Sequence, residues 1–291
     1  MVTILRRRTV ALLMVVLLSC LPGAFAQAPP VSGIAHIALR VGNLQRERAF
    51  FHALGFDEAF VLANGAVPAE VFVKVNDHQF IELYPRNDGQ DALGWMHVCY
   101  ESGSLQQLYG LYSARGLRLS PVVKAGAGNL ISSFHDQDGR VVEFTQYLPG
   151  SRHFEDRGKH LGALRISDEL LAIRMPVHDL SAARQFYETK LGFDEMKGSA
   201  EVRMRISGDT DQWIGLFEES VGAQPQFLFR VSNIAEAAKR LDSRGLRIAQ
   251  RKKHVYVEDP DGNVFVFAKD SLSLSTKAAI HAKQIDERAI E

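Results

Sequence analysis

The chain repeats one structural pattern four times, and this repetition constrains its fold more than any other feature of the sequence. Residues 37–60 match residues 173–196, and both stretches read as a strand, a polar turn, an amphipathic helix and a Leu-Gly-Phe sequence before another strand. Residues 113–119 match residues 242–248 in the same way, and an Asp-x-Asp-Gly turn follows each of them. Each copy therefore predicts one β-α-β-β-β unit.

One such unit cannot bury both faces of its sheet, so we expect the units to pair side by side. The sequence predicts an α+β fold of four tandem βαβββ modules in two domains, each with a curled mixed sheet, helices outside and a concave face inside. We expect the chain to divide into a signal peptide (1–26), a first domain (33–148), a linker (149–168), a second domain (169–270) and a polar tail (271–291). The sequence leaves open whether the modules pair within one chain or across a homodimer.

The first 26 residues have the pattern of a targeting segment rather than of a folded element. Three consecutive arginines precede a short apolar run at 10–18, and an A-x-A cleavage site ends at Ala26. This pattern predicts export, with cleavage after Ala26 and a secreted or periplasmic mature protein. The run that ends at Cys20 also resembles a lipoprotein cleavage box, which would instead anchor the protein to a membrane through a lipidated Cys20.

The charge balance excludes one broad class of partner. The chain has 34 basic and 34 acidic residues, and the part that follows the targeting segment has no basic block. We therefore do not expect nucleic-acid binding, and we expect the partner to be a small molecule. Loss of the targeting segment would leave Cys99 as the single cysteine, so no disulfide can form within the mature chain. Its position in a strand predicts a small buried residue.

Histidine and glutamate recur at matching places in the first two repeats. His36 opens a strand and Glu82 lies in the strand that ends the first repeat, while His97 and Glu143 hold the same places in the second. The offset between histidine and glutamate is 46 residues in both repeats. Both glutamates lie between apolar residues, where a charged side chain needs a partner or a metal. Imidazole and carboxylate together suit one divalent ion, which could be Ni, Zn, Fe, Mn or Co.

These features resemble the vicinal oxygen chelate superfamily, which includes glyoxalase I, methylmalonyl-CoA epimerase, extradiol dioxygenases and the fosfomycin and bleomycin resistance proteins. The resemblance covers nearly all of the chain after the targeting segment. It is carried by the strand at 36–41, the Leu-Gly-Phe helix ends, the Asp-x-Asp-Gly turns and the strands that contain Glu82 and Glu143. It implies that His36, Glu82, His97 and Glu143 are the ligands of one metal ion.

The second domain departs from this pattern. The resemblance places other residues at the four ligand positions, namely Ala172, Gly215, Gln226 and Val266. None of these is a good metal ligand. We therefore expect the second domain to be degenerate and to serve as scaffold, lid or partner surface.

The resemblance implies chemistry on a small substrate whose oxygens the metal chelates. The leading expectation is glyoxalase I-like isomerase or lyase activity by proton transfer, with Glu143 and Glu82 as catalytic carboxylates. Arg40 would bind a carbonyl or carboxylate substrate, because a guanidinium matches carboxylate geometry. Epimerisation would use the same groups, and the sequence does not separate the two reactions.

Two alternatives remain. An extradiol dioxygenase would use Fe²⁺ held by His36, His97 and Glu143, although Ser133 stands where that class carries a tyrosine. A metal-free binding protein of the resistance type would instead line a pocket with aromatic side chains, for which the candidates are Phe50, Phe51, Phe60, Phe72 and Phe134. The ligand set argues against a pure binder.

Overall fold

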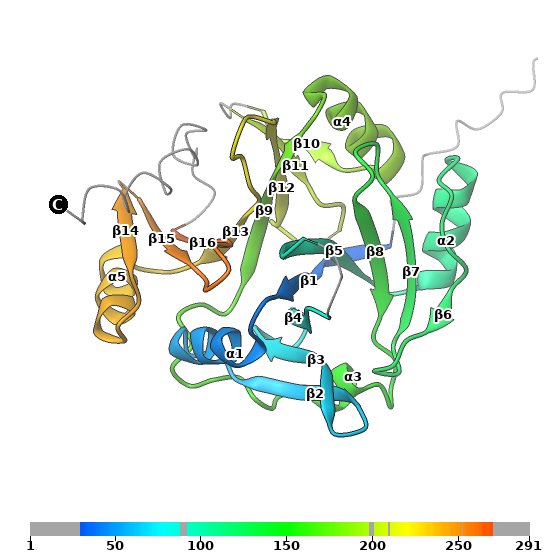
Figure 1. The fold of residues 1–291 in the computed structure, drawn as a ribbon. Helices are drawn as coiled ribbons and strands as arrows, with labels where there is room; N and C mark the ends of the chain where they lie inside the picture. Colours follow the sequence, from blue (N-terminus) through cyan, green and yellow to red (C-terminus); the bar gives the residue numbers. More distant parts are fainter. Residues whose placement is uncertain (1–29, 88–91, 198–200, 209, 252, 270–291) are drawn as a thin grey trace, which may run out of the picture.

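The computed structural model describes residues 30–87, 92–197, 201–208, 210–251 and 253–269. The predicted signal peptide, with Cys20 and Ala26, and the tail at 271–291 lie outside these residues. No helix of the described chain is long and apolar enough to cross a membrane. The described chain forms two eight-stranded mixed sheets with helices packed against them (Figure 1), which confirms the predicted α+β fold of paired βαβββ modules.

The first sheet has the strand order β2-β3-β4-β1-β5-β8-β7-β6. Its strands are β1 (Val31–Val41), β2 (Glu58–Asn64), β3 (Val67–Lys74), β4 (Phe80–Pro85), β5 (Gly94–Ser102), β6 (Val123–Lys124), β7 (Leu130–His135) and β8 (Val141–Gln146). The two modules meet where β1 and β5 pair antiparallel. Modules one and two therefore pair within one chain, which answers the question that the sequence left open.

The second sheet repeats this arrangement in the order β10-β11-β12-β9-β13-β16-β15-β14. Its strands are β9 (Leu170–Val177), β10 (Asp194–Glu195), β11 (Val202–Arg205), β12 (Trp213–Glu218), β13 (Gln226–Arg230), β14 (Ile248–Arg251), β15 (His254–Glu258) and β16 (Val264–Ala268). Here β9 and β13 form the antiparallel seam between the third and fourth modules.

The longer helices begin at polar caps, as the sequence predicts. They are α1 (Leu44–Ala53), α2 (Leu105–Ala114), α4 (Leu180–Phe186), which continues as the π-helical turn η1 (Tyr187–Leu191), and α5 (Ile234–Ser243). The side chains of Asn43, Asp179 and Asn233 each accept a hydrogen bond from a backbone amide in the first turn. Gly55 and Gly192 follow the first and third repeats' helices with φ of 81° and 73°, the left-handed conformation that ends helices.

One apolar core extends across both sheets. The helix α1 of the first sheet packs against β16 of the second, where Phe50 and Phe51 lie 5.6 and 5.4 Å from Phe265 between ring centroids. The helix α4 packs against the first sheet in return, with Phe186 5.9 Å from Phe134. Because each sheet is covered partly by a helix from the other half, neither half buries its apolar surface alone.

The Asp-x-Asp-Gly turns connect the two halves with matching contacts. Asp261 in the second half accepts a hydrogen bond from the backbone amide of Gly42, at the start of the α1 turn, at 2.7 Å. Asp138 in the first half lies 3.1 Å from Nδ1 of His178, at the start of the α4 turn. Turns predicted only as local structure therefore also contact the opposite half.

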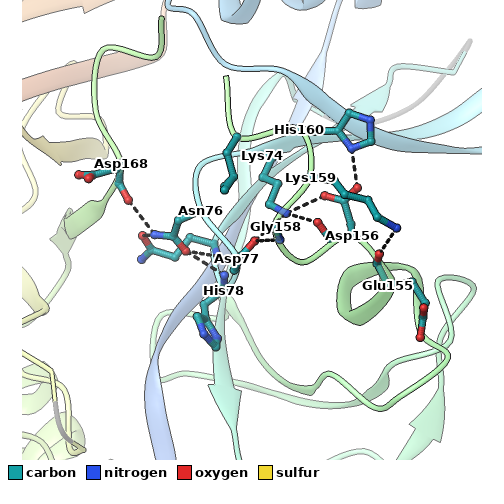
Figure 2. Close-up of polar contacts among 12 residues, drawn as sticks. Lys74, Asn76, Asp77, His78, Glu155, Asp156, Gly158, Lys159, His160 and Asp168 are labelled. Atoms are coloured by element: carbon teal, nitrogen blue, oxygen red, sulfur yellow. Dashed lines mark hydrogen bonds and ion pairs between the residues drawn. The ribbon is translucent and has the colours of Figure 1, made fainter. Parts of the chain in front are cut away.

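The segment predicted as a linker is docked on the first sheet. It contains the short helix α3 (Arg152–Glu155), and Figure 2 shows the polar contacts that follow it. The buried ammonium of Lys74 donates to Asp156 Oδ2 at 2.8 Å and lies 2.9 Å from Asp77 Oδ1. Asp77 also accepts from the amide of Gly158 at 2.8 Å. This buried cation therefore ties the connecting segment to the end of β3.

Replacement of Lys74 by methionine tests the contribution of this ion pair. We expect the free energy of unfolding to fall by about 3–5 kcal/mol, because the buried carboxylate of Asp156 would lose its counter-charge. The matched control is Lys159→Met, at an exposed ammonium, with an expected change of about 0.5 kcal/mol or less. Urea unfolding followed by circular dichroism measures both, and equal small losses would contradict a structural role for Lys74.

A second buried charge lies where α1 meets the second half. Glu47 of α1 is fully buried beside the turn that contains Asp259 and Asp261. Burial, with repulsion from those two carboxylates, raises the pKa of Glu47 to about 9. The side chain is therefore neutral at pH 7 in the folded protein and ionised once the chain unfolds.

This difference predicts a pH-dependent stability. The folded state keeps the Glu47 proton up to about pH 9, whereas an ordinary glutamate loses it near 4.5, so the stability due to this group falls as the pH rises between these values. We expect Glu47→Gln to raise the melting temperature more at about pH 8 than at about pH 5. The exposed Glu236 of α5 provides the control substitution Glu236→Gln. A Glu47→Gln effect that does not grow with pH would show that the carboxyl is already ionised.

Candidate metal centre

The side chains of the candidate centre lie on the concave face of the first sheet. On β1, Ile37 and Leu39 point into the shared core, so His36 and Ala38 face the other way. Ala38 is the register partner of both Glu82 on β4 and His97 on β5. The alternation of strand residues thus brings the predicted ligands of both modules to one side of the sheet.

Three of the four predicted ligands converge. Nε2 of His36 lies 3.2 Å from Nε2 of His97 and 3.4 Å from Oε1 of Glu143, and one donor atom from each residue lies within 4.8 Å of the others. Donor atoms held about 2.0–2.2 Å from a tetrahedral or octahedral ion are roughly 3.0–3.5 Å apart, so these separations fit one metal ion. His36 is buried, while His97 and Glu143 are half-buried and leave one side of the group open.

Glu82, the fourth predicted ligand, lies on the other side of the His36 ring. Its Oε1 is 3.1 Å from Nδ1 of His36, the nitrogen that faces away from His97. One imidazole cannot turn both nitrogens to the same point, so Glu82 in this arrangement lies outside the group of three converging donors. The Glu82 carboxyl thus adjoins the ring of a candidate ligand instead of completing the group of converging donors.

The charge states of the converging groups suit a metal. Burial lowers the pKa of His97 to about 4, so its imidazole is neutral at pH 7. Burial alone would raise the pKa of Glu143, but the hydrogen bond and charge of His36 and the charge of His97 outweigh it and leave the pKa below its usual value. A neutral imidazole and an ionised carboxylate are the forms that bind a cation.

A second pair of carboxyl groups adjoins this centre. The Tyr84 hydroxyl lies 3.1 Å from Glu82 Oε2 and within hydrogen-bond distance of Glu70 Oε1. Burial, and then the charges of Glu70 and Glu143, hold the pKa of Glu82 well above its usual value, and burial raises that of Glu70. Both carboxyl groups therefore hold a proton more readily than an ordinary glutamate does, which makes them candidate proton carriers.

Sequence reasoning did not identify Glu70. It lies on β3, two residues from Phe72, which is the register partner of Glu82. The alternation of β3 therefore places Glu70 on the concave face, but this signal is readable only once the pairing of β3 with β4 is known. The position has no counterpart in the His/Glu pattern of the two repeats.

Arg40 and Cys99 lie where the alternation of their strands predicts. Arg40 is half-buried on β1 as the register partner of Tyr84, on the face that carries Glu82. Cys99 is fully buried on β5 as the register partner of Glu143. Burial, with the charge of Glu143, raises the pKa of the Cys99 thiol well above its usual value, so this thiol is unreactive.

The aromatic residues considered for a pocket divide between the two faces. Phe50, Phe51 and Phe134 belong to the shared core, so they do not line the pocket that the metal-free binding alternative requires. Phe60 and Phe72 do lie on the concave side, stacked with ring centroids 4.2 Å apart. Whether a phenylalanine faces the core or the concave side depends on the face of the helix or strand that it occupies, and the sequence position of a single phenylalanine does not specify that face.

His153 of α3 is a further residue that sequence reasoning missed, because it lies in the predicted linker. Its buried ring stacks on Tyr147 at 4.5 Å and contacts the edges or faces of Phe60, Phe72 and Phe80. Burial is the main cause that lowers its pKa, to about 3. A neutral imidazole therefore closes one end of the concave face as part of an aromatic cluster.

The second sheet has no equivalent of this metal centre among the described residues. Arg174 is the register partner of Gly215 and Gln226, as Ala38 is of Glu82 and His97. This pairing places Gly215 and Gln226 at the positions that Glu82 and His97 hold in the first sheet, as the sequence predicts. Among the described residues, the group of potential metal ligands is the one on the first sheet.

Comparison with known proteins gives a family for part of the chain and a fold for most of it. Residues 169–267 match the model of the Glyoxalase/Bleomycin resistance protein/Dioxygenase superfamily. No curated protein matches the sequence.

Several solved structures share the fold. The Mn(II)-bound glyoxalase from Novosphingobium aromaticivorans matches with a TM-score of 0.66 at 15% identity, over 85% of each chain. A catechol 2,3-dioxygenase matches with a TM-score of 0.64 at 14% identity, over 85% of this chain and 91% of that one. An extradiol ring-cleaving dioxygenase from B. fuscum matches with a TM-score of 0.63 at 16% identity, over 87% and 75%.

The family match covers the half of the chain without the candidate metal centre. The protein therefore contains a domain of the Glyoxalase/Bleomycin resistance protein/Dioxygenase superfamily at residues 169–267, and its described chain as a whole has the fold of solved glyoxalase and extradiol dioxygenase structures.

Proposed function

We propose that the protein is a metal-dependent isomerase or lyase of the glyoxalase I type, which transfers a proton within a small carbonyl or carboxylate substrate. The observation that carries this proposal is the convergence of His36, His97 and Glu143 beside two further carboxyl groups, Glu82 and Glu70, which are linked through the Tyr84 hydroxyl. A bound divalent ion would supply Lewis-acid polarisation of the substrate oxygens. Ni, Zn, Fe, Mn and Co all suit two imidazoles and a carboxylate, so the ion is left open.

Different residues of the chain would bind the ion and transfer the proton. His36, His97 and Glu143 would hold the ion, and Glu82 would accept and return the proton, with Glu70 linked to it through Tyr84. The sequence resemblance implies both Glu143 and Glu82 as catalytic carboxylates. Of the two, Glu82 is the better proton carrier, because its pKa is raised whereas that of Glu143 is lowered.

Arg40 completes the proposed site as the group that binds a substrate carboxylate or carbonyl oxygen. It lies on the same face of the sheet, four residues along β1 from His36. A guanidinium can hold a carboxylate with two parallel hydrogen bonds, which would orient the substrate.

Extradiol ring cleavage is the second candidate. Two histidines and one carboxylate, rather than four protein ligands, form the converging group, and this set is typical of non-haem Fe(II) oxygenases. The catechol 2,3-dioxygenase and the extradiol ring-cleaving dioxygenase named above share the fold. Ser133, the register partner of Glu143, stays at the position where the sequence resemblance expects a tyrosine in that class.

Export belongs to the same proposal. The pattern of the first 26 residues supports secretion or periplasmic location, with membrane anchoring through Cys20 as the alternative. In that location the supply of ions outside the cytoplasm would influence which metal the site receives.

Metal content tests the proposed ligands. We expect the purified protein, after reconstitution, to hold about one equivalent of divalent metal, and His97→Ala to lose most of it because one of three convergent ligands is gone. The exposed His135 at the end of β7 provides the control His135→Ala, which should keep the metal. Elemental mass spectrometry with circular dichroism separates ligand loss from unfolding. Full metal retention in a folded His97→Ala protein would contradict the site.

A second comparison tests the proton-transfer role and separates the two reactions. Glu82→Gln should keep the metal but slow solvent-deuterium exchange into α-hydroxycarbonyl substrates by roughly 10²-fold or more, because general-base catalysis contributes that much. Nuclear magnetic resonance measures the exchange. Oxygen uptake by the Fe²⁺-loaded protein with catechols, and no deuterium exchange with any carbonyl substrate, would replace the isomerase proposal with the dioxygenase.

A further inference from the structure

The concave face of the second sheet carries a buried ionic cluster instead of a metal centre. Arg174 on β9, Arg203 on β11 and Glu201 before β11 are 1%, 3% and 9% exposed. The Glu201 carboxylate accepts hydrogen bonds from Arg174 Nε at 2.8 Å and from Arg203 Nε at 3.0 Å, and its Oε2 lies 2.7 Å from Arg174 Nη2. Arg174 therefore pairs with one oxygen of the carboxylate, and Arg203 pairs with the other.

This cluster occupies the place that corresponds to the metal centre of the first sheet. Arg174 is the register partner of Gly215 and Gln226, and it stands where Ala38 stands between Glu82 and His97. Arg174 Nη1 also donates to Gln226 Oε1 at 2.5 Å. Two domains with one architecture thus present opposite charges: carboxylates and imidazoles that suit a cation in the first, and guanidinium groups that suit an anion in the second.

Two further polar atoms of this face have no hydrogen-bond partner among the described residues. They are Nε1 of Trp213 and Nε2 of His254, in residues that are 0% and 7% exposed. The guanidinium of Arg203 lies over the Trp213 ring at 4.3 Å, so the tryptophan belongs to the same cluster. The buried indole N–H of Trp213 without a partner costs free energy that an oxygen acceptor would recover.

Glu201 is placed so that it can leave the cluster without disrupting the sheet. The strand β11 begins at Val202, and the register pairs of β11 with β12 run from Val202 to Arg205. The Glu201 side chain therefore reaches the two arginines from just outside the paired strand. The Glu201 side chain shows how the two arginines bind a carboxylate, because its own carboxylate is bound between them.

We propose that the concave face of the second domain is a carboxylate-binding site, which takes a small organic carboxylate between Arg174 and Arg203 and in which Glu201 is the internal occupant that this ligand displaces. Trp213 and the partly buried Tyr256 pack in the apolar cluster beside it, which favours a ligand with a flat apolar body. Benzoate is the corresponding probe.

The test is rescue of Glu201→Ala in the full-length protein by sodium benzoate. Removal of the internal carboxylate should lower the melting temperature, because two buried guanidinium groups lose their shared partner. Benzoate should restore it in a saturable manner, whereas sodium chloride at equal ionic strength should not. The control Glu218→Ala, at an exposed glutamate of β12, should show neither the loss nor the rescue.

A double variant and a direct measurement keep the proposal falsifiable. Arg203→Met added to Glu201→Ala should abolish the rescue, and calorimetry should show benzoate binding to Glu201→Ala at least about tenfold more tightly than to the unaltered protein. If Glu201→Ala does not fold, Glu201→Gln replaces it in the same titrations, since it keeps the side-chain shape. Absence of saturable binding in every Glu201 variant, or equal binding after Arg203→Met, would overturn the proposal.

Discussion

The antiparallel pairing of β1 with β5 is the constraint on which the first domain depends. It joins the edges of two βαβββ modules into one sheet, and it puts Ala38 level with His97. Since each strand alternates its faces, the same pairing brings the histidines of both modules to the concave side, with their Nε2 atoms 3.2 Å apart. A slip of one residue would turn His97 toward the core and separate the ligands.

The two halves of the chain share one strand arrangement but carry different charges on their concave faces. The first concave face holds Glu70, Glu82 and Glu143 around two histidines, whereas the second holds Arg174 and Arg203 around one glutamate. Buried charges of either kind are stable only when they are paired or bound to an ion. Replacement of a few concave residues therefore changes what a face can bind while the apolar outer face, which forms the shared core, keeps the fold.

Much of this organisation was predictable because it depends on local periodicity. Helix caps such as Asn43, helix ends such as Gly55 and the alternation that puts His36 and Arg40 on one face all follow from neighbouring residues. The parts that were missed depend on contacts between distant segments. His153 returns to the concave face from the connecting segment, and Glu82 lies beyond the His36 ring rather than beside the other ligands. Neither position follows from spacing alone.

A crystal structure of the metal-loaded protein, with anomalous scattering at the edge of the bound metal, tests whether His36, His97 and Glu143 hold one ion. We predict one ion within about 2.0–2.2 Å of Nε2 of His36, Nε2 of His97 and a carboxylate oxygen of Glu143, with the Glu82 carboxyl beside Nδ1 of His36. An ion held by Glu82 without His97, or an anomalous peak away from the concave face of the first sheet, would contradict it.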